Sequence, residues 1–259
     1  MKKALFILLV FNFQFSILNS LHAADSSTGQ LQRAQLADSA YRIADYEQAA
    51  SLYEEVLASG FASPDLYYNL GNTYYRLDRF GLAILNYERA LRLRPGMSDA
   101  RENMALANTH TVDRIAQLPR LFVVNWYIAL ITRISPSSWR VLTLLFFLLA
   151  FVAVALLVLS HNLTLRKASL ATAIVATVLF VLSLILMLAS IRHFNARSEA
   201  IVLQPSITVK SSPENQSADK LILHEGSKVT ISESLSGWYK ITLSDGTTGW
   251  CQQESIERI

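Results

Sequence analysis

The sequence predicts a multidomain membrane protein that joins an all-α helical-repeat domain, a two-helix transmembrane hairpin and a C-terminal all-β domain. Three observations support this fold class. Similar residues recur at a spacing of 34 in the N-terminal half, two long uncharged apolar runs occupy the centre, and β-branched residues alternate with turn residues near the C-terminus. Apolar residues make up 52% of the chain and charged residues only 17%, which is unusual for a soluble protein. Part of the chain is therefore expected to lie in lipid.

The first segment, residues 1–24, has the order of a secretory signal peptide. Two lysines precede an apolar stretch over residues 4–18, and the small residues Ala23 and Ala24 follow it. The alternative is an uncleaved anchor helix, although two amide side chains within the stretch shorten its apolar core. We expect the signal peptide to export the chain from residue 25 onward.

Two central runs, residues 141–160 and 168–191, contain no charged residue. At 1.5 Å per residue, each helix is long enough to cross the roughly 30 Å hydrocarbon layer of a membrane. We expect transmembrane helices over residues 139–160 and 168–191, joined by a short cytoplasmic loop over 161–167. The alternative is a pair of buried core helices, but the rest of the chain is too small to enclose them.

The distribution of charge argues against nucleic-acid binding, and it agrees with the orientation of the hairpin that export by the signal peptide implies. Residues 25–118 and 198–259 each hold three more acidic than basic residues, and the remaining basic residues all flank apolar runs. Arg166 and Lys167 would keep the short loop in the cytoplasm. Because other arginines lie on the opposite side, export by the signal peptide carries most of this inference. Both soluble domains are then periplasmic or extracellular.

The juxtamembrane segment, residues 119–138, contains an apolar patch over residues 121–131 that is too short to span a membrane. It carries Trp126 and Tyr127, as helices that lie in the membrane interface often do. A soluble helix packed on a neighbouring domain has the same length and composition. The sequence leaves both alternatives open.

Residues 25–118 are predicted to form the helical-repeat domain. Three positions recur after 34 residues, so that Ala37, Ala49 and Tyr53 correspond to Gly71, Ala83 and Tyr87. The second copy, over residues 63–95, resembles the tetratricopeptide repeat (TPR) at Tyr67, Leu70, Gly71, Tyr74, Ala83, Tyr87, Ala90 and Pro95. These are packing positions at which small residues let two helices approach closely. A further helix over residues 99–110 is expected to cap the array.

The resemblance to tetratricopeptide repeats implies a concave groove that binds peptides or partner domains and is lined by the first helix of each pair. By phase, the groove positions are Asp38, Tyr41, Arg42, Tyr68, Asn72, Tyr75, Arg76 and Glu102. Asn72 and Arg76 suit a carboxylate or a backbone carbonyl of an extended segment. A solvated polar face is the alternative for any single residue, whereas the clustered aromatics favour binding by the whole face.

The C-terminal segment, residues 192–259, is predicted to form a small β-barrel. Its stretches HEGSKVTI, GWYKI and LSDGTTGW resemble the bacterial SH3-like domain, and the clearest hairpin runs from Trp238 to Trp250. We expect both tryptophans to pack in the core of the barrel, because buried aromatics dominate small cores. The resemblance implies cell-wall polymer, such as peptidoglycan, or a peptide as the ligand of this domain.

Residue patterns typical of enzymes are missing from the sequence. The five histidines are scattered, and there is no phosphate-binding loop, nucleophile elbow or zinc-protease motif. Cys251 is expected to be a buried small hydrophobe, because no separate domain remains to supply a base for it. We predict no catalytic residues, no cofactor and no metal site, and therefore a protein that is not an enzyme.

The whole order of segments resembles the BatE proteins of the Bacteroides aerotolerance operon. That resemblance implies a non-enzymatic scaffold of a bacterial envelope complex, in the inner membrane with both soluble domains in the periplasm and linked to oxidative stress. It also implies von Willebrand factor A-type membrane proteins and a MoxR-type ATPase system as partners. The alternative function is a sensor or anchor that binds peptidoglycan through the SH3-like domain.

Overall fold

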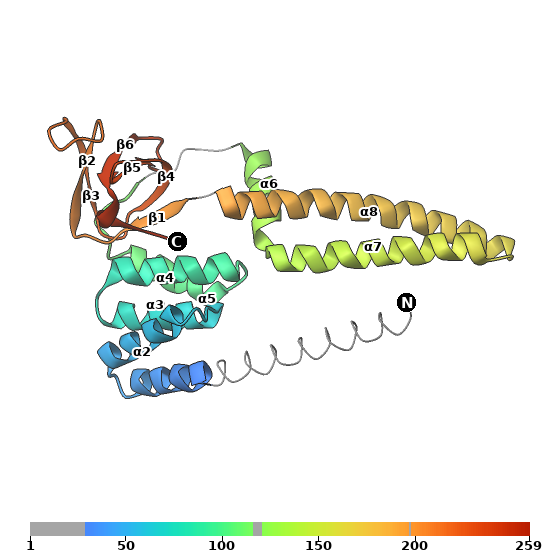
Figure 1. The fold of residues 1–259 in the computed structure, drawn as a ribbon, viewed down its shortest axis with the longest axis horizontal. Coiled ribbons are helices and arrows are strands. Elements are labelled where there is room, and N and C mark those ends of the chain that lie inside the picture. The colour runs from blue at the N-terminus through green and yellow to red at the C-terminus, as the bar shows by residue number, and fades with distance from the viewer. Residues whose placement is uncertain (1–28, 116–120, 197) are drawn as a thin grey trace, which may run out of the picture.

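The computed structural model describes residues 29–115, 121–196 and 198–259 of the chain. Figure 1 shows a helical domain and a β domain packed together at one end, with a long helical hairpin extending away from them. The predicted fold class is confirmed, because a helical-repeat region, two long apolar helices and an antiparallel sheet domain follow one another along the chain.

The helical domain consists of two helix pairs and one further helix. Its described part begins in a helix that ends at residue 42. The elements that follow are α2 (Tyr46–Ala58), α3 (Pro64–Arg76), α4 (Phe80–Leu93) and α5 (Ser98–Asn108). The repeat extends to the backbone, since Ala44 and Asp78 lie 34 residues apart and both adopt positive φ, at 63° and 57°, in the turn between paired helices. The predicted array of two pairs and a cap is therefore present.

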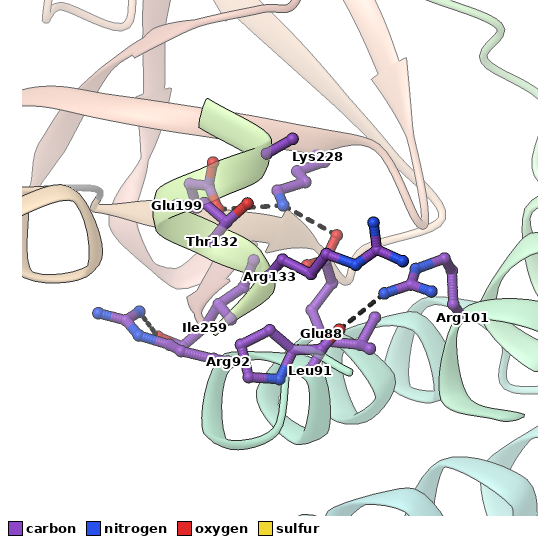
Figure 2. A pocket seen from close by; sticks show the side chains of 11 residues that line it. Glu88, Leu91, Arg92, Arg101, Thr132, Arg133, Glu199, Lys228 and Ile259 are labelled. Atoms are coloured by element: carbon purple, nitrogen blue, oxygen red, sulfur yellow. Dashed lines mark hydrogen bonds and ion pairs between the residues drawn. The ribbon is translucent and has the colours of Figure 1, made fainter. Parts of the chain in front are cut away.

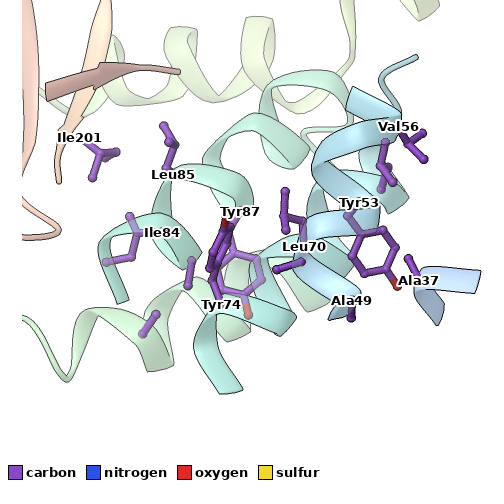
Figure 3. Close-up of a cluster of buried hydrophobic side chains, with 14 of the residues drawn as sticks. Ala37, Ala49, Tyr53, Val56, Leu70, Tyr74, Ile84, Leu85, Tyr87 and Ile201 are labelled. Atoms are coloured by element: carbon purple, nitrogen blue, oxygen red, sulfur yellow. The ribbon is translucent and has the colours of Figure 1, made fainter. Parts of the chain in front are cut away.

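Close approach between helices explains the small residues at the repeat positions. A Cβ atom on Gly71 would lie 2.7 Å from the ring of Tyr87, so only glycine fits between α3 and α4 at this point. Ala83 is fully buried in the same core. Figure 3 shows Leu70 and Tyr74 in this core. These residues act in packing, as the sequence predicts.

The hairpin consists of α7 (Pro136–Leu159) and α8 (Leu163–Ala196). Both helices are long and apolar enough to cross a membrane, and only 11% and 17% of their most apolar windows are buried. This exposure argues against the alternative of core helices. Since α8 begins at Leu163, the connection from α7 covers only residues 160–162 and is shorter than the predicted loop.

A short helix, α6 (Phe122–Arg133), precedes the hairpin and packs on its second helix. The hydroxyl of Ser190 on α8 donates a buried hydrogen bond of 2.9 Å to the carbonyl oxygen of Ile131. Phe122 and Trp126 remain largely exposed on the same helix. The apolar patch is therefore a helix at the end of the hairpin that faces the two soluble domains.

The β domain is one antiparallel sheet of seven strands in the order β3-β2-β6-β5-β4-β1-β7. The strands are β1 (Glu199–Val202), β2 (Ser206–Lys210), β3 (Asp219–His224), β4 (Lys228–Leu235), β5 (Trp238–Thr242), β6 (Thr248–Gln252) and β7 (Ile256–Arg258). The predicted hairpin is present as β5 and β6, with Trp238 opposite Gln252. Alternate residues of these strands, including Ile241 and Cys251, enter the core.

The prediction that Trp238 and Trp250 lie in this core is wrong. Both are half-buried, and their neighbours Tyr239 and Cys251 are the residues that contact the core. Because side chains alternate between the two faces of a strand, the register that buries Cys251 places Trp250 on the outer face. There the ammonium group of Lys240 lies 5.9 Å from the centre of the Trp250 ring.

Candidate functional site: the groove of the helical domain

The groove of the helical domain contains two adjoining hollows with volumes of about 210 and 440 Å³. The first is lined by Asp38, Tyr41, Arg42, Tyr53, Asn69 and Asn72. The second is lined by Tyr41, Tyr68, Asn72, Tyr75, Arg76, Asn103 and Leu106. Tyr41 and Asn72 line both, so the two hollows form one continuous surface across the first helices of successive repeats. Of the groove positions expected from the sequence, all but Glu102 line it.

Asp38 forms part of the floor of the groove and is held by two donors. The hydroxyl of Tyr53 donates to Asp38 Oδ1 at 2.5 Å, and the side-chain amide of Asn69 donates to the same oxygen at 3.2 Å. Burial, and then the neighbouring carboxylate, raise the pKa of Tyr53, which keeps the hydroxyl protonated as a donor. Asp38 therefore fixes the first repeat against the second as well as facing the groove.

The same arrangement recurs in the second repeat with a neutral acceptor. The hydroxyl of Tyr87 and the side-chain amide of Asn103 each donate to Asn72 Oδ1 at 2.8 Å, and each of these three residues lies 34 positions after its counterpart. Asn103 also donates to the hydroxyl of Tyr68 at 3.1 Å. Since both bonds occupy Oδ1, Asn72 Nδ2 keeps its two hydrogens, and within the described residues it has no acceptor.

Glu102 is exposed on α5 and lines neither hollow, whereas its neighbours Asn103 and Leu106 do. The buried positions of α5, Ala100 and Ala107, turn the face with Asn103 toward α3. Asn103 was not predicted from the sequence. The repeat contained a signal for it, since Asn69 occupies the equivalent position 34 residues earlier.

The groove offers an extended ligand both donors and aromatic surface. Arg76 is exposed at one end of it, and the half-buried rings of Tyr41, Tyr68 and Tyr75 form its walls. The Tyr75 hydroxyl lies 3.3 Å from His110 Nε2, which orients this ring from the end of α5. An arginine and a free amide beside tyrosine rings suit backbone carbonyls or a carboxylate of a peptide.

Cys251 and possible metal ligands can be assessed in the described residues. Cys251 is 1% exposed, and burial raises the pKa of its thiol to about 11, so little reactive thiolate forms at neutral pH. Within the described ranges, no group of three or more His, Cys, Asp or Glu residues could hold a metal ion.

Comparison with known proteins identifies one segment of the chain. None of the curated proteins matches the sequence. Residues 64–97, which form α3 and α4, match the family of tetratricopeptide repeats. The helix pair at the centre of the groove is therefore a tetratricopeptide repeat, a module that typically binds other proteins.

Proposed function

We propose that this protein is a membrane-anchored scaffold without catalytic activity that holds a segment of a partner protein in the groove of its helical domain. The observation that carries the proposal is the continuous groove surface, in which the side chains of Tyr68, Asn72 and Arg76 face one cavity system. A tetratricopeptide repeat is an interaction module, and an extended segment that follows this groove would meet donors and rings from the first helix of each repeat and from α5.

The membrane anchor in this proposal is the hairpin of α7 and α8. Their outward apolar side chains need an apolar solvent, and lipid provides it. The signal peptide over residues 1–24 lies outside the described residues. It would export the remainder, so that both soluble domains occupy the periplasmic side of a bacterial cytoplasmic membrane, where the outer face of α6 would rest in the headgroup region.

The order of domains supports a place in an envelope complex. Signal peptide, repeats, hairpin and β domain follow one another as in BatE proteins, so we propose von Willebrand factor A-type membrane proteins as partners. A MoxR-type ATPase system would act in the same complex, with a role in aerotolerance. Tethering two interaction domains beside the membrane raises their effective concentration, which allows each contact to be weak.

A second candidate function, recognition of peptidoglycan or a peptide by the SH3-like β domain, is favoured by the outward position of its tryptophans. Trp238 and Trp250 lie on the outer face of neighbouring strands, and Leu235 is exposed opposite Trp238. Half-exposed aromatic rings bind sugars and peptides well because they combine apolar area with a polar edge.

The groove can be tested by crosslinking in intact cells followed by identification of the captured proteins. The double variant Arg76→Ala, Leu106→Ala removes two exposed side chains that line the groove, so folding should be retained. Arg79→Ala is the matched control, since Arg79 is exposed near the same end of α3 but lines neither hollow and pairs with Glu47. We expect protein partners to be lost in the double variant and kept in the control.

Two results would change the assignment. A partner list that is identical in all three proteins would remove the groove from the mechanism. Recovery of cell-wall fragments without protein partners, abolished by Trp250→Ala, would establish the second candidate function instead.

A further inference from the structure

A second cavity, separate from the groove, lies where the helical domain, the β domain and the base of the hairpin meet. Its volume is about 470 Å³, and its walls come from α4, α5, α6, β1 and β4 (Figure 2). Cavities of this size are typical of sites for small molecules. Residues from three parts of the chain that are distant in sequence thus converge on one space.

Both glutamates of this cavity form ion pairs with the same lysine. Lys228 on β4 lies 2.8 Å from a carboxylate oxygen of Glu88 and 3.0 Å from one of Glu199. Although burial lowers the pKa of Lys228, the two carboxylates outweigh it and hold this pKa above its ordinary value. The lysine therefore stays charged and balances one of the two negative charges.

Three arginines complete the wall, and two of them retain most of their donors. Arg92 donates to the carbonyl oxygen of Ile259 at 2.5 Å. Arg101 uses one nitrogen in a 2.7 Å bond to the carbonyl oxygen of Pro95. Within the described part of the chain, Arg133 has no hydrogen bond or ion pair. Each guanidinium carries five N–H donors, so Arg101 and Arg133 face the cavity with unmet donor capacity. The side chains that line the cavity include four cations and two glutamates, so positive charge is in excess.

The cavity lies at the level where the hairpin would enter a membrane. Arg133 is the last residue of α6, and α7 begins three residues later at Pro136. The bond from Ser190 to Ile131 fixes this end of α6 against α8 near Arg192, a charged residue that closes the apolar run of that helix. If the hairpin spans the bilayer, this wall of the cavity is at headgroup depth.

We propose that this cavity binds the phosphate of an anionic phospholipid headgroup between Arg101 and Arg133. Guanidinium groups bind phosphate oxygens in a bidentate manner, and two of them on different helices would grip one phosphate from two sides. The exposed apolar side chains of Phe122 and Trp126 on α6 lie on the same helix as Arg133, so acyl chains would have apolar surface beside the site. The bound lipid would join α5 to α6 and hold the soluble domains at the membrane.

The inference rests on the proposed insertion of the hairpin, and a separate measurement tests that step. Alkaline carbonate extraction of cell membranes should leave the full-length chain in the membrane pellet. Release into the supernatant would overturn insertion and the lipid site together. Retention combined with absent lipid binding would overturn the site alone.

Binding can be measured by native mass spectrometry of the full-length protein in detergent, titrated with phosphatidylglycerol, phosphatidylcholine or inorganic phosphate. We expect one phosphatidylglycerol per chain to bind in preference to phosphatidylcholine, and Arg101→Gln or Arg133→Gln to weaken this binding about tenfold. Arg133→Lys should restore part of the affinity because it keeps the charge. Arg140→Gln is the matched control, since Arg140 is exposed near the start of α7 but does not line the cavity.

The other outcomes each overturn the proposal. Equal losses for Arg140→Gln and Arg133→Gln would show headgroup attraction without a site. Inorganic phosphate that displaces phosphatidylglycerol at equal concentration would identify a free anion as the ligand. Unchanged binding in both cavity variants, with unchanged circular dichroism, would exclude the cavity itself.

Discussion

The second helices of the two repeats, α2 and α4, occupy equivalent places in the repeat but have different neighbours. At two successive positions α2 carries Ala50 and Ser51, where α4 carries Ile84 and Leu85. Ser51 is exposed, whereas Leu85 is 1% exposed in a cluster that includes Ile201 of the β domain (Figure 3). The larger side chains are present on the helix that the β domain covers.

Two further positions of α4 also differ from α2 where α4 contacts the β domain. Where α2 has Glu47 and Glu55, α4 has Gly81 and Arg89. The backbone N–H of Gly81 donates to Glu225 at 2.8 Å, and a Cβ at this position would lie 2.5 Å from that side chain. Arg89 forms a 2.7 Å ion pair with Glu257. Positions at which α4 differs from the residue 34 positions earlier thus lie at the contact with the β domain. Several positions that keep the same residue type in both repeats lie in the groove.

The largest expected effect comes from truncating the buried side chain of Leu85, at which α4 differs from α2. Leu85→Ala should lower the free energy of unfolding of the soluble domains by about 3 kcal/mol, because it leaves a cavity under the β domain. Ser51→Ala, at the equivalent exposed position, should change it by less than about 0.5 kcal/mol. Urea unfolding of the full-length protein in nanodiscs, followed by near-ultraviolet circular dichroism, measures both.

A double-mutant cycle locates the effect at the junction. The combined variant Leu85→Ala, Ile201→Ala should lose less stability than the sum of the single variants by at least about 0.5 kcal/mol, since both residues belong to one cluster. Strict additivity would mean that Leu85 stabilises the helical domain alone, so that its burial on α4 would not depend on the β domain.

A smaller loss of stability is expected at the turn of the β domain that packs on the helical domain. Gly226 has a φ of +88°, and a Cβ here would lie 2.5 Å from Thr111 and 3.1 Å from Ile84. Gly226→Ala should therefore cost about 2 kcal/mol, combining a left-handed backbone with a clash. Gly237 has a φ of +84° with nothing within 4 Å, so Gly237→Ala isolates the backbone cost of about 1 kcal/mol. Equal losses of stability in the two variants would show that the turn is free of the helical domain.

The sequence predicted the elements whose cause is local or periodic. The spacing of 34 located the helix pairs, and seven of the eight groove positions predicted from it line the hollows, because each repeat packs on its neighbour in the same way. The two uncharged runs predicted the hairpin, because length and hydropathy are also local properties of the sequence. Both signals depend on residues close together in the chain.

The junction between the domains was not predicted, because its contacts join residues separated by more than a hundred positions. Glu225 bonds Gly81 and Lys228 pairs with Glu88, and neither segment alone indicates the other. The positions of Trp238 and Trp250 were wrong for a related reason. Strand alternation shows which residues share a face but does not show which face is buried.

The third expected effect concerns the linker after α5, which is bound to the β domain through Asp113. Its carboxylate accepts from the Ser227 hydroxyl at 2.5 Å and from the His224 backbone N–H at 2.6 Å, and it lies 2.9 Å from His224 Nδ1. Burial would raise the pKa of Asp113, but these hydrogen bonds outweigh burial and hold it below its ordinary value of 3.8. Asp113→Asn should lower the free energy of unfolding at neutral pH by about 1.5 kcal/mol.

The dependence on pH follows from the direction of that shift. Because the folded protein binds the proton of Asp113 more weakly than the unfolded chain, this contribution is complete above the unfolded pKa. It is lost as the pH falls through the lower pKa of the folded state. Unfolding measured from neutral to acidic pH should show a shallower decline for Asp113→Asn than for the unaltered protein. Parallel curves would show that Asp113 does not contribute in this way.

The smallest effect on stability is expected for a substitution in the groove. A groove variant that stays folded can show whether lost partner binding is independent of folding. Arg76 is exposed and lies at the edge of the groove, so Arg76→Ala should change the free energy of unfolding by less than about 0.5 kcal/mol. Asn72→Ala should cost more, about 1 kcal/mol, because it leaves the Tyr87 hydroxyl and the Asn103 amide without their shared acceptor. If Arg76→Ala destabilised the protein as much as Asn72→Ala, loss of partners in groove variants would reflect unfolding. Because Arg76→Ala is expected to leave stability almost unchanged, a partner that this variant loses must have been bound by the groove. The groove keeps the repeat pattern because each helix pair adds the same surface to it.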